Sequence, residues 1–223
     1  MNSVRQIGAI IWRDLVIEIR AKESLSTMLL FALITLVIFN FGFELRLGNV
    51  REVAPGVLWV GFTFAGILGL SRSLSRDQEQ GALEGLMLSP AERGTIYLGK
   101  MLANLAIMSL MEVVLLPLFV ALFNVSLAHP LLAPVTLLGT IGFVATGTLL
   151  AAMTVNTRAR EVLLPVLLFP LAVPVLIAAV KATGLILDGG GWSEIRGWVQ
   201  LMAGYDLVAL VLAYLTFDVI LEQ

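Results

Sequence analysis

Between two long apolar runs the chain reads Asp77-Gln-Glu-Gln-Gly-Ala-Leu-Glu-Gly-Leu-Met-Leu-Ser-Pro90, and this polar interval closes with Gly99-Lys100. Leu83, Leu86 and Met87 recur at helical spacing, which predicts a narrow apolar stripe on a short helix. Ser-Pro then ends the helix, because the residue before proline is pushed out of helical geometry. A simple link between two apolar segments needs no helix of its own. The interval therefore predicts a docking element for a soluble partner.

The start of this helix is also marked in the sequence. Ser75 or Asp77 is suited to cap it, and the carboxylates of Asp77 and Glu79 lie where the helix dipole favours negative charge. Glu84 lies among hydrophobic neighbours and is available to bind a basic group on a partner. We therefore interpret residues 71–100 as a cytoplasmic coupling loop that carries its own helix.

The chain as a whole is apolar. Of its 223 residues, 59% are hydrophobic and 13% charged, with a mean hydropathy of +0.96, whereas soluble domains are about 45–50% apolar and about 25% charged. We predict an all-α, polytopic membrane protein with one transmembrane domain over residues 1–223, and no room for a soluble catalytic domain. The absence of cysteine excludes disulfides and thiolate metal sites. Six stretches are long enough to cross a hydrocarbon core of about 30 Å: Leu25–Phe43, Val53–Leu70, Met101–Phe123, Leu131–Met153, Val162–Val180 and Trp198–Phe217.

Basic residues are unevenly divided between the predicted loops, as the positive-inside rule requires when the N-terminus is cytoplasmic. An even number of spans returns the C-terminus to the same side. The first apolar run has no small-residue cleavage site after it, so we interpret it as a retained span. On this topology Arg46, Arg51, Lys181 and Arg196 are outside, and the cytoplasmic side has Arg5, Arg13, Arg20, Lys22, Arg72, Arg76, Arg93, Lys100, Arg158 and Arg160.

Residues 1–24 precede the first span and are amphipathic. Apolar residues such as Val4, Trp12 and Ile19 recur at helical spacing, and Arg13 and Glu18 belong to the polar side. This pattern is typical of a helix that lies in the membrane interface. A solvated helix that only leads into the first span is the alternative.

A second, shorter polar segment occupies residues 154–161 and contains Arg158 and Arg160. Together with the 71–100 loop it could receive force from a cytoplasmic partner. Positive-inside topology alone explains its charge equally well, so both interpretations stand.

Two carboxylates, Glu112 and Asp206, fall inside predicted spans, where an unpartnered charge costs about 2.5–3.5 kcal/mol on insertion scales. Each is either a pathway or gating group or a structural hydrogen-bonding group, and we predict that both face the bundle interior. The single histidine, His129, precedes Pro130 in a short outer loop and is more typical of a surface residue than of a haem ligand.

Two catalytic hypotheses fail on the sequence. Residues 94–100 match the start of a phosphate-binding loop, but Met101 follows where the Mg²⁺-binding hydroxyl is required. An aspartyl protease needs two carboxylates that share a site, and Glu112 would be an unusual partner for Asp206. The chain is therefore expected not to be an enzyme and not to hydrolyse ATP itself.

The pattern Asp77-x-x-x-Gly81-x-Leu83-Glu84-x-Leu86-x-x-Ser89-Pro90, with Gly99-Lys100 at the mouth of a span, resembles the ABC-2 type permeases. These are six-span subunits that pair with a separate ATPase. The resemblance implies that the 71–100 loop holds their coupling helix, and residues 1–24 their interfacial helix. The ATPase-coupling residues it implies are Arg76, Asp77, Glu79, Gly81, Leu83, Glu84, Leu86, Pro90, Arg158 and Arg160.

A narrower resemblance is to the haem exporter protein B (CcmB) family of cytochrome c maturation. It rests on Arg13-Asp14-Leu15 with Arg20, on Pro117, on the proline-rich stretch from 163 to 174, and on Tyr205-Asp206 with Phe217. It covers nearly the whole chain. Ala82 stands where a threonine is more usual in such loops.

This resemblance implies a multi-pass protein of the bacterial inner membrane, with both termini cytoplasmic. Its implied partners are a CcmA-like ATPase, CcmC- and CcmD-like membrane proteins, the haem chaperone CcmE and a second copy of the chain; no nucleic acid is expected. ATP hydrolysis by the partner would drive haem delivery or release of the haem-loaded chaperone, with haem as a handled substrate and no bound cofactor. The alternatives are an ABC-2 exporter of a drug, lipid or polysaccharide, and a non-transporting membrane adaptor.

Overall fold

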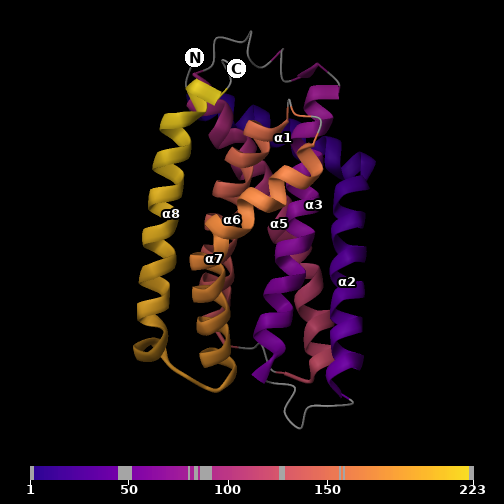
Figure 1. Cartoon of the computed structure of the whole chain (residues 1–223), viewed down its shortest axis with the longest axis vertical. Coiled ribbons are helices and arrows are strands. Elements are labelled where there is room, and N and C mark those ends of the chain that lie inside the picture. Colours follow the sequence, from indigo (N-terminus) through magenta and orange to yellow (C-terminus); the bar gives the residue numbers. More distant parts are fainter. Residues whose placement is uncertain are drawn as a thin grey trace.

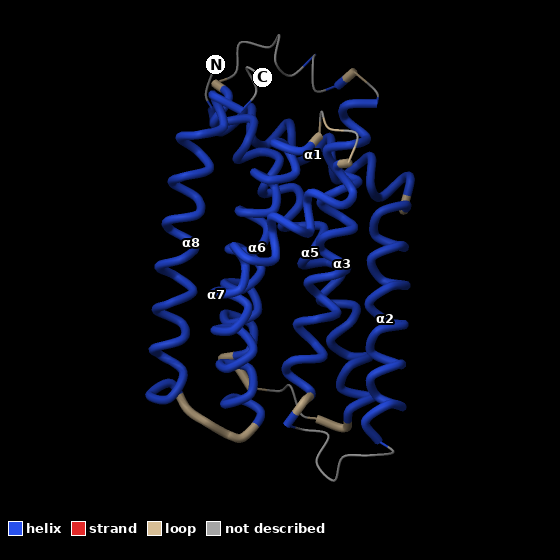
Figure 2. The backbone as a smooth tube through the Cα atoms, in the orientation of Figure 1, coloured by secondary structure: helices blue, strands red, loops and turns tan. Residues whose placement is uncertain are grey.

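A computed structural model describes residues 3–44, 52–79, 81, 82, 85, 92–125, 129–155, 157 and 159–220, with the side chains of 43, 44 and 218–220 excepted. Regular structure within these ranges is helical only, and the described loops are short and confined to the two ends of the bundle (Figure 2). This confirms the predicted all-α class.

The described helices run in the order α1 (Ser3–Ala21), α2 (Glu23–Glu44), α3 (Ala54–Glu79), α5 (Arg93–Phe123), α6 (Leu132–Thr154), α7 (Arg160–Leu187) and α8 (Trp192–Ile220). All except α1 are long and apolar enough to cross a membrane. They correspond one for one to the six predicted spans, although most are longer than the apolar cores that define them.

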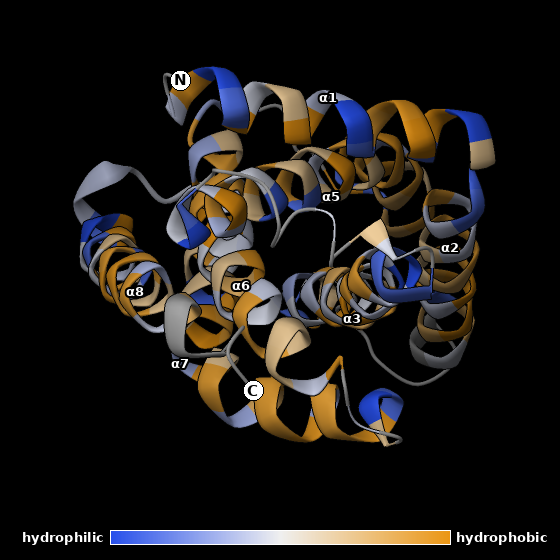
Figure 3. Cartoon of the chain, turned by 90° about the horizontal axis from the view of Figure 1, so that it is seen from above, coloured by the Kyte–Doolittle hydropathy of each residue, from blue (hydrophilic) through white to orange (hydrophobic). Residues whose placement is uncertain are grey.

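The six long helices stand side by side, with both chain termini at one end of the bundle (Figure 1). We call this the terminal end and the opposite one the far end. Helix α1 also lies at the terminal end and runs across the bundle: seen from above, it extends lengthwise while the long helices are viewed nearly end-on (Figure 3). Helix α1 therefore does not cross with the others, as predicted for an interfacial helix.

Helices α3 and α6 form the centre of the bundle, and most of their residues are buried. Small residues allow close approach there, as is common between membrane helices. A Cβ atom at Gly139 would overlap the Trp59 ring, and one at Gly66 would lie 3.0 Å from Met108. The helices therefore pack closely at these two glycines.

The second and third spans extend further towards the terminal end than the sequence predicted. Helix α3 continues past Leu70 to Glu79, and α5 begins at Arg93 rather than at Met101. Residues 71–79 and 93–100 are therefore span ends, and the connection between them is limited to residues 80–92. A hydropathy pattern ends these spans too early because residues 71–79 and 93–100 include charged side chains. In the structure these residues nevertheless belong to helices that pack against other helices.

Helix α7 contains Pro165, Pro170 and Pro174 and remains one helix from Arg160 to Leu187. Each proline removes a backbone hydrogen bond and crowds the preceding turn. In Figure 1 the helix changes from an oblique to an upright course along its length. The three prolines account for this bend.

Candidate coupling site

The corner between α1 and α2 fixes the interfacial helix to the bundle. Lys22 adopts a left-handed conformation with φ of 54°, and its N–H donates to the Glu18 carbonyl at 2.6 Å. The Glu18 side chain then accepts the N–H of Leu25 at 2.7 Å, which caps the first turn of α2. A single buried carboxylate thus defines the angle between the two helices.

The polar side of α1 faces the protein, and part of its apolar side faces outward. Glu18 and Ile10 are buried, whereas Val4, Trp12 and Ile19 are among the most exposed apolar side chains. A solvated helix would have the opposite arrangement. The orientation supports an interfacial helix with its apolar stripe towards the membrane.

Four charged side chains from three helices meet under α1. The Lys100 ammonium of α5 lies 2.6 Å from Asp14 Oδ2 and also pairs with Asp77 of α3. Arg13 pairs with Asp77 and lies 3.2 Å from Asp14 Oδ1. Lys100 and Asp77 are 2% and 3% exposed, so this is an internal group of two cations and two anions. We call Arg13, Asp14, Asp77 and Lys100 the buried charge cluster.

The pair Gly99-Lys100 has a direct structural role in this cluster. At Gly99 a Cβ atom would lie 2.9 Å from the side chain of Ile10, so α1 rests on α5 where α5 has no side chain. The next residue, Lys100, then reaches Asp14 on the same face of α1. In the sequence this pair is part of a motif; the structure shows that it docks α1.

A second group of ion pairs continues the cluster towards α2. Arg76 Nη1 lies 3.3 Å from Glu18 Oε2, and its Nη2 lies 3.5 Å from Glu23 Oε2. Arg72 Nη1 lies 3.1 Å from Glu23 Oε1. Helices α1, α2, α3 and α5 are thus linked at the terminal end through charged side chains.

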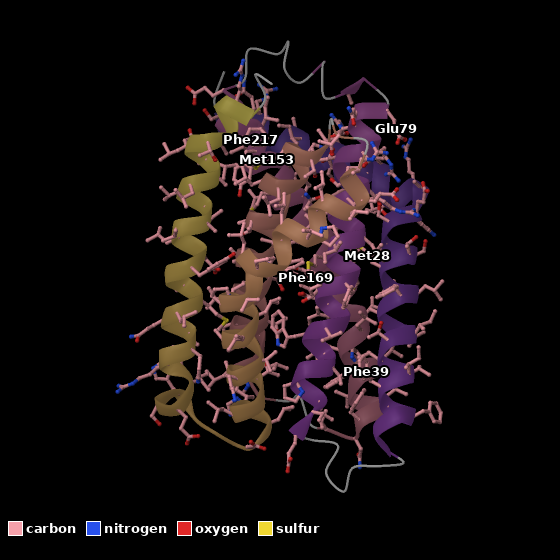
Figure 4. All side chains as sticks on the ribbon, viewed as in Figure 1. Met28, Phe39, Glu79, Met153, Phe169 and Phe217 are labelled. Carbon is pink, nitrogen blue, oxygen red and sulfur yellow. The ribbon has the colours of Figure 1, made fainter. Side chains whose placement is uncertain are left out.

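A further pair joins the two connections at this end. Arg160, the first residue of α7, lies 2.9 Å from Glu79 Oε1, at the last residue of α3, and its Nη1 donates to Gln78 at 3.4 Å. In Figure 4, Glu79 lies at the terminal end among nitrogen and oxygen atoms of neighbouring side chains, and Phe39 lies towards the far end. The end of α3 and the start of α7 are therefore neighbours in space.

These contacts correct part of the predicted site. Neither Ser75 nor Asp77 caps a helix: both lie within α3, the Ser75 hydroxyl donates to the Ser71 carbonyl, and Asp77 is ion-paired. The family resemblance implied that Asp77 contacts an ATPase. The structure corrects this, because Asp77 is too deeply buried for such a contact. Arg76, Glu79 and Arg160 are each engaged in pairs within the chain.

The chain leaves α3 at Gly81, whose φ of 64° suits a residue without a Cβ. Helical backbone resumes at Ala82 and Gly85, and the Gly85 N–H donates to the Gly81 carbonyl at 3.2 Å. A helix in this segment therefore begins after Gly81, not at Ser75. Five predicted coupling residues, Leu83, Glu84, Leu86, Pro90 and Arg158, lie outside the described residues.

Asp14, Glu18 and Lys100 were not predicted from the sequence as site residues. The available signal was the charge on one side of an otherwise apolar amphipathic helix, spaced at Arg13, Asp14 and Glu18. A lysine at the mouth of a span is usually explained by membrane topology. Only the crossing of α1 over α5 shows that these charges are partners.

The two carboxylates within the spans have different surroundings, and both are buried as predicted. Glu112 Oε1 accepts a 2.6 Å hydrogen bond from the Thr140 hydroxyl of α6. Asp206 of α8 packs where Gly142 of α6 leaves room, and neither of its oxygens has a hydrogen-bond partner in the described part of the chain. The two carboxyl groups therefore share no hydrogen bond, which argues against a catalytic pair.

Comparison with known proteins gives a consistent result. The family model described as CcmB protein matches residues 5–222. The chain is 35% identical to Heme exporter protein B of Rhodobacter capsulatus over 205 residues, covering 92% of this chain and 93% of that protein. It is 32% identical to Heme exporter protein B of Paracoccus denitrificans, with the same coverage, and 31% identical to that of Escherichia coli K12 over 86% of this chain and 90% of that protein. The chain belongs to the CcmB family.

Membership of the CcmB family agrees with the architecture. The matched range contains the buried charge cluster, Glu112 and Asp206, and the six apolar helices are those of a multi-pass membrane transporter component. The stretch 94–100 that resembles a phosphate-binding loop is part of α5, and its lysine is the buried Lys100. A CcmB-family chain with this geometry has no nucleotide site at that position.

The other candidate sites in this CcmB-family chain have less structural support. His129 lies at the far end, where its Nδ1 accepts the Leu131 N–H at 3.3 Å. Among the described residues, no three histidine, aspartate or glutamate side chains are grouped to hold a metal ion. The terminal end is therefore the best-developed site in the described chain.

Proposed function

We propose that this chain is the membrane subunit of an ABC-type complex of cytochrome c maturation, in which a separate CcmA-like ATPase supplies the energy. One observation carries the mechanical part of the proposal. Asp77, near the end of α3, and Lys100, near the start of α5, pair with each other and with α1. The segment between them, residues 80–92, is thus bounded on both sides by the same buried charge cluster.

This arrangement suits transmission of force. A partner that pushes on residues 80–92 would move the ends of α3 and α5 together, because separating them breaks a buried ion pair. Helix α1 would move with them through Arg13 and Asp14. The Arg160–Glu79 pair would bring the α6–α7 turn into the same motion.

The predicted coupling residues then divide into two groups. Arg76, Asp77, Glu79 and Arg160 act as positioning residues, which connect the helices within the chain. Gly81, Leu83, Glu84, Leu86, Pro90 and Arg158 are the proposed contact surface for the ATPase.

The relatives support haem as the substrate class, because they are named Heme exporter protein B. We take haem, delivered or released with the chaperone CcmE, as the handled substrate, and CcmC- and CcmD-like proteins and a second copy of the chain as further partners. The family and the basic residues near the terminal end support an inner-membrane location with both termini in the cytoplasm. These names do not favour the alternative of a drug, lipid or polysaccharide exporter.

Co-purification tests the proposal. The tagged chain is extracted from native membranes in mild detergent, and the associated proteins are identified, with haem measured by absorbance. An ATPase recovered with a haem-handling membrane protein is the expected result. Recovery of an ATPase alone would redirect the proposal to a general exporter, and recovery of no ATPase would refute it.

A charge reversal locates the contact. Glu84→Lys should abolish ATPase binding or stimulation while the chain still accumulates in the membrane. Glu194→Lys, the same change at an exposed residue of the far end, is the matched control and should have no effect. Unchanged binding and activity in Glu84→Lys would remove that residue from the contact surface.

A further inference from the structure

A groove runs between α5 and α6 in the half of the bundle near the far end. It has a volume of about 600 Å³ and extends along α5 from Ser109 to Val120. Eleven residues of helix rise about 16 Å, which is about half of a 30 Å hydrocarbon core. Its walls are mostly apolar, and Val113 and Leu137 on its rim are exposed. His129 and Pro130 lie at its far-end mouth.

The end of the groove nearest the middle of the membrane contains a polar side chain with an unused hydrogen-bond acceptor. Glu112 is 3% exposed and lines the groove. Its Oε1 accepts the Thr140 hydroxyl, whereas Oε2 accepts no hydrogen bond from any described residue. A carboxyl oxygen inside a membrane without a donor is costly. The groove is therefore equipped to receive a ligand that brings a hydrogen-bond donor to the middle of the membrane.

A stripe on α5 extends the groove along the rest of the helix. Its members recur at intervals of three or four residues and are exposed or half-buried: Leu102, Ala106, Leu110, Val113, Pro117 and Ala121. Such spacing is that of one face of a helix pair. Two of the six are alanines, and small residues allow transmembrane helices to approach closely.

We propose that this surface binds a transmembrane helix of another membrane protein, which places a donor side chain against Glu112. A lipid chain would fill the apolar walls but offers no donor at this depth. A second copy of this chain, packed symmetrically through the same stripe, would bring its own Glu112 and Ser109 to the same place, and two carboxylates that share a site disfavour each other's charge. The occupant is thus a different polypeptide with a donor-bearing side chain near the middle of its span. This inference does not depend on the ATPase contact.

Site-specific photo-crosslinking tests it. A photoreactive amino acid is placed at Val113 on the rim of the groove, and at Leu207 on the exposed face of α8 as the control; both are apolar and about 65% exposed. Crosslinking is carried out in native membranes, and the captured peptide is sequenced. The expected product at Val113 is a transmembrane peptide of another protein with a donor side chain within one helical turn of the crosslink. Leu207 should give no such product.

Substitutions then examine the hydrogen bond. Glu112→Leu should lower the yield at Val113 by about three- to twentyfold, the range measured for hydrogen bonds between membrane helices, and Glu112→Gln, which keeps an acceptor oxygen, should not. If Glu112→Leu fails to accumulate, removal of the partner's donor makes the same test and should give the same loss.

Lipid adducts alone at Val113, capture of a second copy, or equal capture at Val113 and Leu207 would each overturn the proposal. Recovery of the ATPase from the same membranes distinguishes its failure from failure of the proposed function.

Discussion

Asp77 and Asp206 are almost equally buried, at 3% and 5% exposed, yet they are held in opposite ways. Asp77 is surrounded by Arg13 and Lys100 and belongs to a balanced group of charges. Asp206 fits against Gly142 and has no hydrogen-bond partner. The junction of α1, α3 and α5 is thus specified by charge, and the junction of α6 and α8 by shape. The buried acid near the terminal end is thus neutralised by its ion pairs, whereas Asp206, within a span, has no hydrogen-bond partner among the described residues.

The largest effect should follow from removing the cation of the charge cluster. Lys100→Met leaves Asp14 and Asp77 with only Arg13, and breaking a buried pair costs about 3–5 kcal/mol. The free energy of unfolding, measured by denaturation in mixed micelles, should fall by that amount. Lys100→Met combined with Asp77→Leu should recover most of it, because replacing both partners of a buried pair by apolar residues is often neutral.

Arg72→Ala is the control for this prediction, since it removes an exposed pair with Glu23 and should cost less than about 1 kcal/mol. Equal losses from Lys100→Met and Arg72→Ala would show that the cluster is not a buried electrostatic unit.

A smaller effect is expected where packing decides. Gly142→Ala introduces a Cβ that would lie 2.8 Å from the Tyr205 ring and would also meet Asp206. Overpacking of this kind costs about 1–3 kcal/mol. Gly204→Ala in α8, where a Cβ meets nothing within 4 Å, should be neutral or slightly stabilising in the same unfolding experiment. A neutral Gly142→Ala would mean that α6 and α8 do not approach closely.

Asp206→Ala makes the comparison sharper, because it should change stability in the opposite direction to a change at Asp77. It removes a buried group that has no partner, so unfolding should be unchanged or harder by about 1–3 kcal/mol. Loss of cytochrome c maturation at unchanged stability would assign Asp206 to a pathway or gating role. A marked loss of stability would instead show that it has a structural partner in the assembled complex.

The smallest effect on stability should come from the pair at the edge of the cluster. Arg160→Ala removes the contact with Glu79, whose side chain is 66% exposed, and exposed pairs contribute about 0.2–1 kcal/mol. If the pair joins the two connections, ATPase stimulation should fall clearly although the free energy of unfolding changes little. Arg196→Ala at the far end is the control, and equal stimulation in both variants would exclude that role.

Element by element, the sequence was most informative where burial in lipid set the pattern. All six spans were found, and the interfacial helix was placed correctly, because apolar length and amphipathic spacing report directly on the surrounding solvent. The end of α3 was missed by nine residues and the start of α5 by eight, since both contain charged side chains that are ion-paired to α1. A hydropathy pattern assigns such turns to loops. In the structure, however, ion pairs take the place of the water molecules that would hydrate the charges of a loop.

The candidate site shows the same division at the level of single residues. Arg76, Asp77, Glu79 and Arg160 were recognised as important, but their interpretation as contacts for an ATPase was incomplete, because their partners are 23 to 81 residues away in the chain. Asp14 and Lys100 were quoted only as parts of family motifs and not as site residues. No local pattern reports a pair such as Asp14–Lys100, which depends on where one helix crosses another.

By itself, the sequence determined a six-span, all-helical membrane protein of the CcmB family with an amphipathic helix before the first span. Apolar length and helical spacing are local properties of the sequence, and they determine which segments span the membrane and which lie at its surface. Tertiary structure alone decided that the polar face of α1 turns inward onto Lys100 and Asp77, that Glu112 has Thr140 as a partner, and that Asp206 has none among the described residues. These facts depend on distances between segments far apart in sequence, which packing sets.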